Sequence, residues 1–238
     1  MNWSAFPLVA GMVTAMWHVW SGPDHLAAVT PLVLQRRRRF APVGIAWGVG
    51  HTIGMMLIGG LYLLLQSYLP VDRISAHSEQ LVGLTLVGVG AVAVFRGRRG
   101  WMHHAHPHAH QDGDEVYVHV HRHHHTLSEG HRHEHAHREP QRQGVLTALG
   151  IGILHGFGGI AHLLLLLPTL GFSHTWQSAA YLGGFFGGAI AAMGSYAAVV
   201  GRMGARIEQR MPRARFVLQI GSGLAAVLIG IYWMAAGA

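Results

Sequence analysis

Six residues with metal-binding side chains interrupt long apolar stretches of the sequence. They are His18, Asp24, His25, His51, His155 and His162. Imidazole nitrogens and carboxylate oxygens suit borderline divalent ions such as Ni²⁺, Co²⁺, Zn²⁺ and Cu²⁺ better than Mg²⁺ or Ca²⁺. A carboxylate in the middle of a membrane costs about 2.5–3.5 kcal/mol on insertion scales, so we expect Asp24 to have a polar partner. The chain contains no Cys, which excludes a thiolate metal site and a catalytic Cys.

The elements that must carry these residues are six apolar stretches, which we interpret as membrane-crossing helices. They run roughly over residues 6–34, 42–69, 79–95, 144–168, 176–201 and 215–236. Hydrophobic residues make up 50% of the chain and charged residues only 11%, which excludes a disordered chain and argues against an ordinary soluble core. Gly22-Pro23 should break the first helix, because Pro removes a backbone donor and disfavours helix at the preceding residue. The sequence therefore predicts an all-α membrane protein with six transmembrane helices, the first of them broken.

The basic residues indicate how these helices are oriented. All 17 are Arg, and 16 of them fall within residues 36–39, 96–142 and 202–215, on alternate connections between the apolar stretches. The positive-inside rule assigns these connections to the cytoplasm and both termini to the outside. This predicts a multi-pass protein of the cytoplasmic (inner) membrane, and it accounts for the net charge of +7 without nucleic acid as a partner. Residues 1–8 lack a basic region, so we expect the first stretch to remain as a helix rather than to be removed as a signal peptide.

The two halves of the chain share a short pattern at an offset of 137 residues. The pattern matches His18, His25 and Pro31 with His155, His162 and Pro168. Each copy holds three membrane stretches, and two copies with an odd number of spans must be inverted, which is a design of secondary transporters. We therefore divide the chain into a three-helix repeat, a loop and a second three-helix repeat, at residues 1–95, 96–143 and 144–238. At the positions of the second copy that match Asp24 and His51, the sequence has Ala161 and Gly188. A metal site would therefore be asymmetric, with most of its ligands in the first copy.

Three motifs resemble those of the nickel/cobalt transporter family of bacterial membrane proteins. His18-Val-Trp-Ser-Gly-Pro-Asp24-His25 is similar to the family's His-(x)4-Asp-His motif, with five intervening residues in place of four. Trp47-Gly-Val-Gly-His51-Thr52 and Leu154-His155-Gly156 are similar to motifs of its six-span branch, which is associated with urease and hydrogenase maturation. The resemblance implies that His18, Asp24 and His25 are metal ligands and that His51 lies in or beside the site. It also implies Ni²⁺ or Co²⁺ as the substrate, and a cytoplasmic metallochaperone or a urease or hydrogenase maturation system as a partner.

The segment between the third and fourth stretches is rich in His. Residues 103–137 contain 14 of the 21 His, several in His-x-His repeats such as His119-Val-His121. This composition is typical of a disordered segment that binds metal ions weakly at several positions. A cytoplasmic loop of this kind suits an exporter that collects ions, or an importer whose delivered ions are buffered and sensed. A passive linker is the alternative reading, and the direction of transport stays open.

Several functions remain open. The favoured hypothesis is a secondary transporter of Ni²⁺ or Co²⁺ with a His and Asp site at the broken helix. Zn²⁺ is an alternative cargo because it binds similar ligands, and a metal sensor or subunit that signals to a partner is an alternative function. No prosthetic group is expected, and the sequence indicates neither the oligomeric state nor the coupling ion.

An enzyme is not expected. The chain has no P-loop and no Lys, so it cannot hydrolyse a nucleotide in the way P-loop proteins do. An intramembrane serine protease would need a nucleophilic Ser in the fourth stretch. That stretch contains none, and its centre reads Leu154-His155-Gly156-Phe157-Gly158-Gly159.

Overall fold

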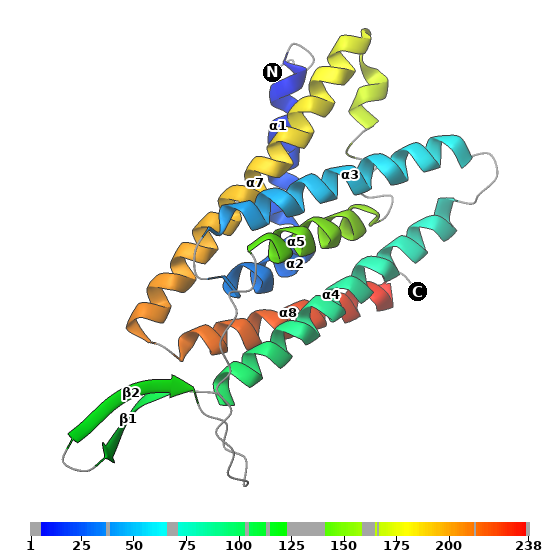
Figure 1. The fold of residues 1–238 in the computed structure, drawn as a ribbon. Helices are drawn as coiled ribbons and strands as arrows, with labels where there is room; N and C mark the ends of the chain where they lie inside the picture. Colours follow the sequence, from blue (N-terminus) through cyan, green and yellow to red (C-terminus); the bar gives the residue numbers. More distant parts are fainter. Residues whose placement is uncertain are drawn as a thin grey trace.

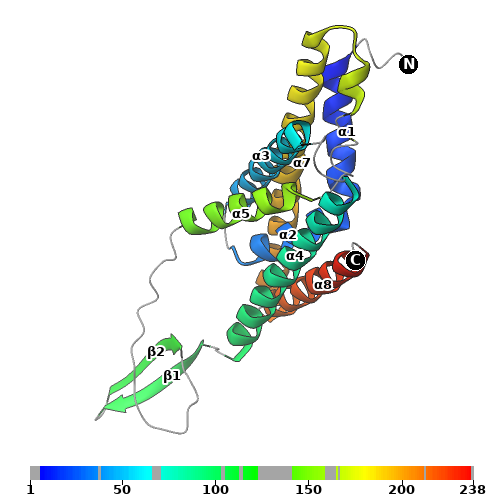
Figure 2. The ribbon, with the colours of Figure 1, turned by 90° about the vertical axis from the view of Figure 1, so that its right-hand side faces the viewer.

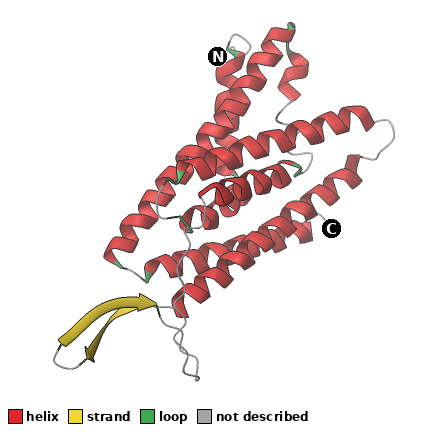
Figure 3. Ribbon diagram, viewed as in Figure 1, coloured by secondary structure: helices red, strands yellow, loops and turns green. Residues whose placement is uncertain are grey.

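The computed structural model describes residues 6–36, 39–65, 71–102, 105–112, 115–122, 141–158, 165, 167–211 and 213–236. These residues form seven α-helices, one 3₁₀ helix and one two-stranded hairpin (Figure 1, Figure 3). The α-helices are α1 (Pro7–Ser21), α2 (Pro23–Leu34), α3 (Ala41–Leu65), α4 (Val71–Met102), α5 (Gln141–Gly156), α7 (Thr175–Arg210) and α8 (Ala214–Ala236). The 3₁₀ helix η2 spans Leu167–Gly171, and the strands are β1 (Ala105–Asp112) and β2 (Glu115–Arg122).

Four helices in the described part of the chain are long and apolar enough to cross a membrane. The qualifying segments are Ala41–Leu61, His77–Arg99, Thr175–Arg210 and Ala214–Ala236. Large apolar side chains point outward along them, such as Leu61 at 50% and Leu228 at 68% exposure. Lipid can cover an apolar surface of this extent at no cost, whereas water cannot, so the fold is that of a membrane protein.

The predicted break in the first helix is confirmed. Gly22 ends α1 and begins α2, with an extended backbone at φ −81° and ψ 103°. Pro23 occupies the first position of α2, where its missing N–H is not needed. A Cβ on Gly22 would lie 2.5 Å from Nδ1 of His25 and 3.0 Å from Oδ1 of Asp24. Glycine is therefore required here because two polar side chains approach the backbone closely.

The predicted helix lengths need correction at three places. The stretch 144–168 is not one helix, since α5 ends at Gly156 and its closing bonds, from Phe157 N and Gly158 N, reach back only three residues. Glycine costs about 1 kcal/mol in a helix, so the glycines at 156 and 158 favour this end. By contrast, α4 and α7 extend beyond the predicted 79–95 and 176–201. Their polar ends form helical hydrogen bonds that an apolar window does not detect.

A hairpin lies within the predicted His-rich segment. Strands β1 and β2 pair antiparallel, with Ala105 opposite Arg122 and Asp112 opposite Glu115. Part of 96–143 therefore has regular structure, because α4 continues to Met102 and because the alternating residue types of this segment match the two-residue period of a strand. Residues 123–140 lie outside the described residues. The division of the chain into two repeats and a loop stays a prediction.

Glycines bring three pairs of helices into backbone contact. The pairs are α1 with α7, α3 with α5, and α4 with α8, and the members of each pair lie side by side in both views (Figure 1, Figure 2). A Cβ added at Gly184, Gly50 or Gly90 would overlap a backbone oxygen of the partner helix. Small residues at such positions let helices in a membrane pack closely, where no hydrophobic effect holds them together.

Replacing Gly152 with Ala should destabilise the protein by about 1–3 kcal/mol, because the new methyl group would overlap the carbonyl oxygen of Trp47 and push α5 away from α3. Gly150 is the matched control, since a Cβ there meets nothing within 4 Å. The Gly150→Ala variant should be neutral or gain up to about 1 kcal/mol from better helix propensity. Thermal unfolding of both variants in detergent tests this, and equal stabilities would contradict the packing described here.

Candidate metal centre

Four helices converge on one buried polar cluster. His18 lies in the last turn of α1, and Asp24 and His25 lie in the first turn of α2, on either side of the break at Gly22. His51 comes from the middle of α3, and His155 from the last turn of α5. The side chains of Asp24, His25, His51 and His155 belong to residues no more than 6% exposed. The broken helix thus supplies the residues that face α3 and α5.

Asp24 is bonded to two histidines from different helices. Its Oδ1 lies 3.0 Å from Nδ1 of His25, the next residue, and its Oδ2 lies 3.0 Å from Nε2 of His155. The expectation that a membrane carboxylate would have a polar partner is therefore confirmed. Asp24 also lies in the first turn of α2, where the positive end of the helix dipole stabilises a negative charge.

Two further imidazoles, those of His18 and His51, lie beside His25. The ring centroids of His18 and His25 are 4.6 Å apart, those of His25 and His51 are 5.0 Å apart, and those of His18 and His51 are 6.3 Å apart. Each of these residues offers one ligand atom within 4.8 Å of the others, and the same holds for Asp24, His25 and His155. Ligands at about 2.1 Å in a tetrahedral metal site lie about 3.4 Å from one another. A small contraction of either group could therefore hold an ion.

The far nitrogen of His155 supports a ligand-binding role. Its residue is completely buried, and Nδ1 has no hydrogen-bond partner among the residues that the structure describes. Buried polar atoms are nearly always hydrogen-bonded, so such an atom needs an explanation. An imidazole with one nitrogen held by a carboxylate and the other without a partner can accept a ligand at the second nitrogen.

Trp47 is part of the cluster and was missed in the sequence. Its fully buried ring stacks on that of His51 at a centroid distance of 4.9 Å and an interplanar angle of 13°. It also lies 5.6 Å from the ring of His25 and 5.2 Å from that of His155. The sequence did contain a signal for this contact. Trp47 precedes His51 by four residues, and residues with this spacing lie on the same face of a helix. Trp47 forms an apolar wall that excludes water from the imidazoles.

Five of the six predicted site residues lie together. They are His18, Asp24, His25, His51 and His155. His162, the sixth, lies in 159–164, outside the described residues. His77 is exposed on α4, and His174 precedes the first turn of α7, so neither belongs to the cluster.

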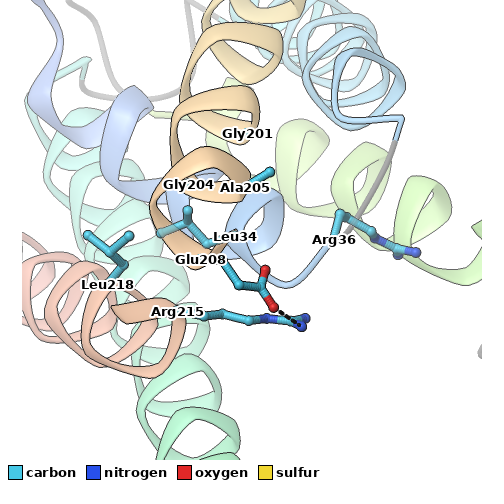
Figure 4. A pocket seen from close by; sticks show the side chains of 8 residues that line it. All are labelled: Leu34, Arg36, Gly201, Gly204, Ala205, Glu208, Arg215 and Leu218. Atoms are coloured by element: carbon cyan, nitrogen blue, oxygen red, sulfur yellow. Dashed lines mark hydrogen bonds and ion pairs between the residues drawn. The ribbon is translucent and has the colours of Figure 1, made fainter. Parts of the chain in front are cut away.

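A small pocket lies at the opposite end of α2 (Figure 4). It has a volume of about 10 Å³, enough for one water molecule at most. An ion pair between Arg215 and Glu208 at 3.3 Å lines it, and Arg215 also donates to the carbonyl oxygen of Gln35 at 3.2 Å. Arg96 donates to the side-chain oxygen of Gln35 at 2.7 Å. This end of α2 is therefore held by arginines, and the one carboxylate in the pocket lining, that of Glu208, is already paired with Arg215.

Three curated proteins are similar to the chain over almost its full length. The chain is 29% identical over 231 residues to Chloroplast protein FOR GROWTH AND FERTILITY 1 of Arabidopsis thaliana, covering 93% of the chain and 59% of that protein. It is 32% identical over 222 residues to Chloroplast protein FOR GROWTH AND FERTILITY 2 of the same plant, covering 93% and 54%. It is 26% identical over 229 residues to Urease accessory protein UreH of Bacillus sp. (strain TB-90), covering 95% and 90%.

These similarities relate the chain loosely to the family that its motifs resemble. The chain spans little more than half the length of the two plant relatives, but most of the bacterial one. No family model and no solved structure matches it. The matches support the broad resemblance to metal transporters and not the narrower six-span branch. None of the three names describes a catalytic activity.

Replacing Trp47 with Ala should destabilise the protein by about 3–5 kcal/mol, because a large buried ring would leave a cavity between three imidazoles. Trp47→Phe keeps an aromatic ring beside His51 and should cost clearly less. Trp17, which is 75% exposed on α1, is the control, and Trp17→Ala should have little effect. Unfolding by heat or by sodium dodecyl sulfate in mixed micelles measures the difference. Similar losses for the two Ala variants would contradict a structural role of Trp47 in the cluster.

Proposed function

We propose that the protein is a secondary transporter that moves a divalent transition-metal ion, Ni²⁺ or Co²⁺, across the membrane. The observation that carries this proposal is the cluster of four histidines and one aspartate beside a helix break, of which all but the half-buried His18 are buried. Ionisable groups inside a membrane are costly, and where they occur they commonly mark a path for ions or protons. Broken helices in membranes are typical of transporter sites, because the freed backbone must face protein or a cavity.

The ligand chemistry supports a borderline divalent ion as the cargo. Imidazole nitrogens dominate the cluster, and such ligands favour Ni²⁺, Co²⁺, Zn²⁺ and Cu²⁺ over Mg²⁺, Ca²⁺ and Mn²⁺. Among these ions, the motif around His18, Asp24 and His25 favours Ni²⁺ or Co²⁺, because it resembles that of nickel/cobalt transporters. Zn²⁺ is the alternative cargo at the same site. We assign His18, Asp24, His25, His51 and His155 to this site, and His162 stays a candidate.

The inverted repeat is part of the same proposal. Met12 of α1 contacts Gly188 of α7. With the offset of 137 residues, the positions equivalent to 12 and 188 in the other copy are 149 and 51. The observed contact between α5 and α3 joins Leu149 and Gly50. The two helix pairs therefore share one register to within a single residue, as two copies of one three-helix unit would. Two such units in opposite orientations can open the site alternately to the two sides of the membrane.

The orientation and partners follow from the sequence and remain proposals. The distribution of Arg predicts that both termini lie outside and that the His-rich segment lies in the cytoplasm, where it would collect or buffer ions. The name of the bacterial relative, a urease accessory protein, supports a partner in urease maturation that uses the delivered ion. A partner in hydrogenase maturation rests on the motif resemblance alone. A metallochaperone is a second partner of this kind.

Flux measurements test the site. Purified protein in liposomes should carry Ni²⁺ and Co²⁺, and His25→Ala or His51→Ala should reduce the rate at low ion concentration by more than about tenfold, because losing a ligand costs at least as much as losing its hydrogen-bond partner. His77→Ala is the control, since this exposed His lies outside the cluster. Unchanged flux in both cluster variants would contradict the assignment of His25 and His51 to the metal site. Metal binding without flux in the unmodified protein would favour the sensor or subunit hypothesis.

The direction of transport is tested in whole cells. Import predicts that cells producing the protein accumulate more Ni²⁺ or Co²⁺ than cells without it, whereas export predicts less. Parallel measurements with Zn²⁺ compare the alternative cargo. The His25→Ala variant is the control for effects of membrane expression, and it should remove any difference in either direction.

A further inference from the structure

The carboxylate of Asp24 determines which nitrogen of two imidazoles carries the proton. An ionised carboxylate only accepts hydrogen bonds, so both histidines that contact it must donate. His25 then carries its proton on Nδ1, which lies 3.0 Å from Oδ1, and His155 carries its proton on Nε2, which lies 3.0 Å from Oδ2. In each neutral ring, the other nitrogen keeps its lone pair.

The second nitrogen of His25, Nε2, can bind an ion together with nitrogens of His18 and His51. Nε2 of His25 is buried, and the His25 ring lies edge-on to those of His18 and His51 at 4.6 and 5.0 Å. Since Nδ1 is directed at Asp24, Nε2 is the atom through which His25 can join these two rings around an ion. The group of His18, His25 and His51 therefore offers three nitrogens without disturbing Asp24.

Direct binding of Asp24 to the ion would have a cost that the three nitrogens avoid. Each oxygen of Asp24 already accepts a bond from a buried imidazole. An ion on the remaining lone pairs of the carboxylate would draw electron density from its oxygens and weaken these bonds. If one of them broke, a buried N–H left without an acceptor would cost about 1–3 kcal/mol. A carboxylate that accepts a hydrogen bond from the ring nitrogen not bound to the metal is a common partner of metal-binding imidazoles.

We propose that Asp24 is a positioning residue rather than a ligand: it fixes the tautomers of His25 and His155, and the ion is bound by nitrogens of His18, His25 and His51. This inference rests on the proposed metal site and narrows its chemistry. An all-nitrogen site discriminates against hard ions such as Mg²⁺ and Mn²⁺ more strongly than a mixed site with a carboxylate does. His155 extends the same hydrogen-bonded unit to α5.

X-ray absorption of Co²⁺ or Ni²⁺ bound to the full chain in detergent tests the ligand assignment. The spectrum of the unmodified protein should show at least three imidazoles and no carboxylate. Asp24→Asn should keep the number of imidazoles while the dissociation constant rises about 10–100-fold, as expected when only the partner of a ligand is lost. His51→Ala should lose one imidazole. Loss of a directly bound oxygen in Asp24→Asn, with His51→Ala unchanged, would overturn the proposal.

Nitrogen-15 NMR of labelled histidines in the metal-free protein reports which ring nitrogen of each histidine carries the proton. These tautomers should depend on Asp24 only if it positions the rings through its hydrogen bonds. The unmodified protein should show His25 protonated on Nδ1 and His155 on Nε2. In Asp24→Asn, the amide has one accepting and one donating atom, so one of the two rings must switch its proton to the other nitrogen. Unchanged tautomers in this variant would contradict the proposal.

The two levels of proposal fail differently. If the unmodified protein binds neither Ni²⁺ nor Co²⁺, both the metal site and the role of Asp24 are wrong. If it binds and transports the ion but the spectrum shows a carboxylate oxygen that Asp24→Asn removes, only the role of Asp24 is wrong. His77→Ala again serves as the control, and it should change neither the spectrum nor the affinity.

Discussion

The burial of one carboxylate among four helices is the constraint on which the rest of the cluster depends. An isolated charge in such a place is unstable, so Asp24 requires donors from its surroundings. One donor, His25, is adjacent in sequence, but the other, His155, comes from α5, 131 residues further along. This second bond ties α5 to α2. The break at Gly22 follows from the same need, because only a new helix start puts Asp24 in a first turn. Glycine at the break leaves room for the carboxylate, since a Cβ on Gly22 would lie only 3.0 Å from its oxygen.

Glycine makes the distances within the cluster possible. The rings of His51 and His155 lie 5.8 Å apart on two different helices, α3 and α5, whose backbones are in contact. Gly50 and Gly152 provide this contact, since a Cβ on either would overlap an oxygen of the opposite backbone. The high glycine content of the chain is thus part of the site's geometry. It is not a sign of flexibility, because these glycines lie inside regular helices.

The sequence predicts the local features of the site and misses those that depend on packing between distant segments. The helix break and the cluster residues could be predicted, because Gly-Pro and ionisable groups in apolar stretches have strong local causes. The bond from Asp24 to His155 could not, because the repeat pairs His155 with His18 and says nothing of contacts across helices. Trp47 was missed because a buried Trp in an apolar stretch has the same signature as any packing residue. The end of α5 was missed because hydropathy detects apolar character and not where the backbone leaves the helix.

The polar contacts along α2 connect this short helix, which carries Asp24 and His25, with four other helices. In the proposed transporter, α2 is therefore suited to couple the metal site to the rest of the bundle. At its first turn, Asp24 is bonded to α5. In its middle, the hydroxyl groups of Thr30 and Tyr196 are 2.6 Å apart and join it to α7. Beyond its last turn, Gln35 accepts bonds from Arg96 of α4 and Arg215 of α8. Any displacement of α2 that changes the ligand geometry must therefore strain contacts with four other helices. In the proposed transporter, a shift of His25 on ion binding would act on α2, whose polar contacts connect it to helices of both halves of the chain.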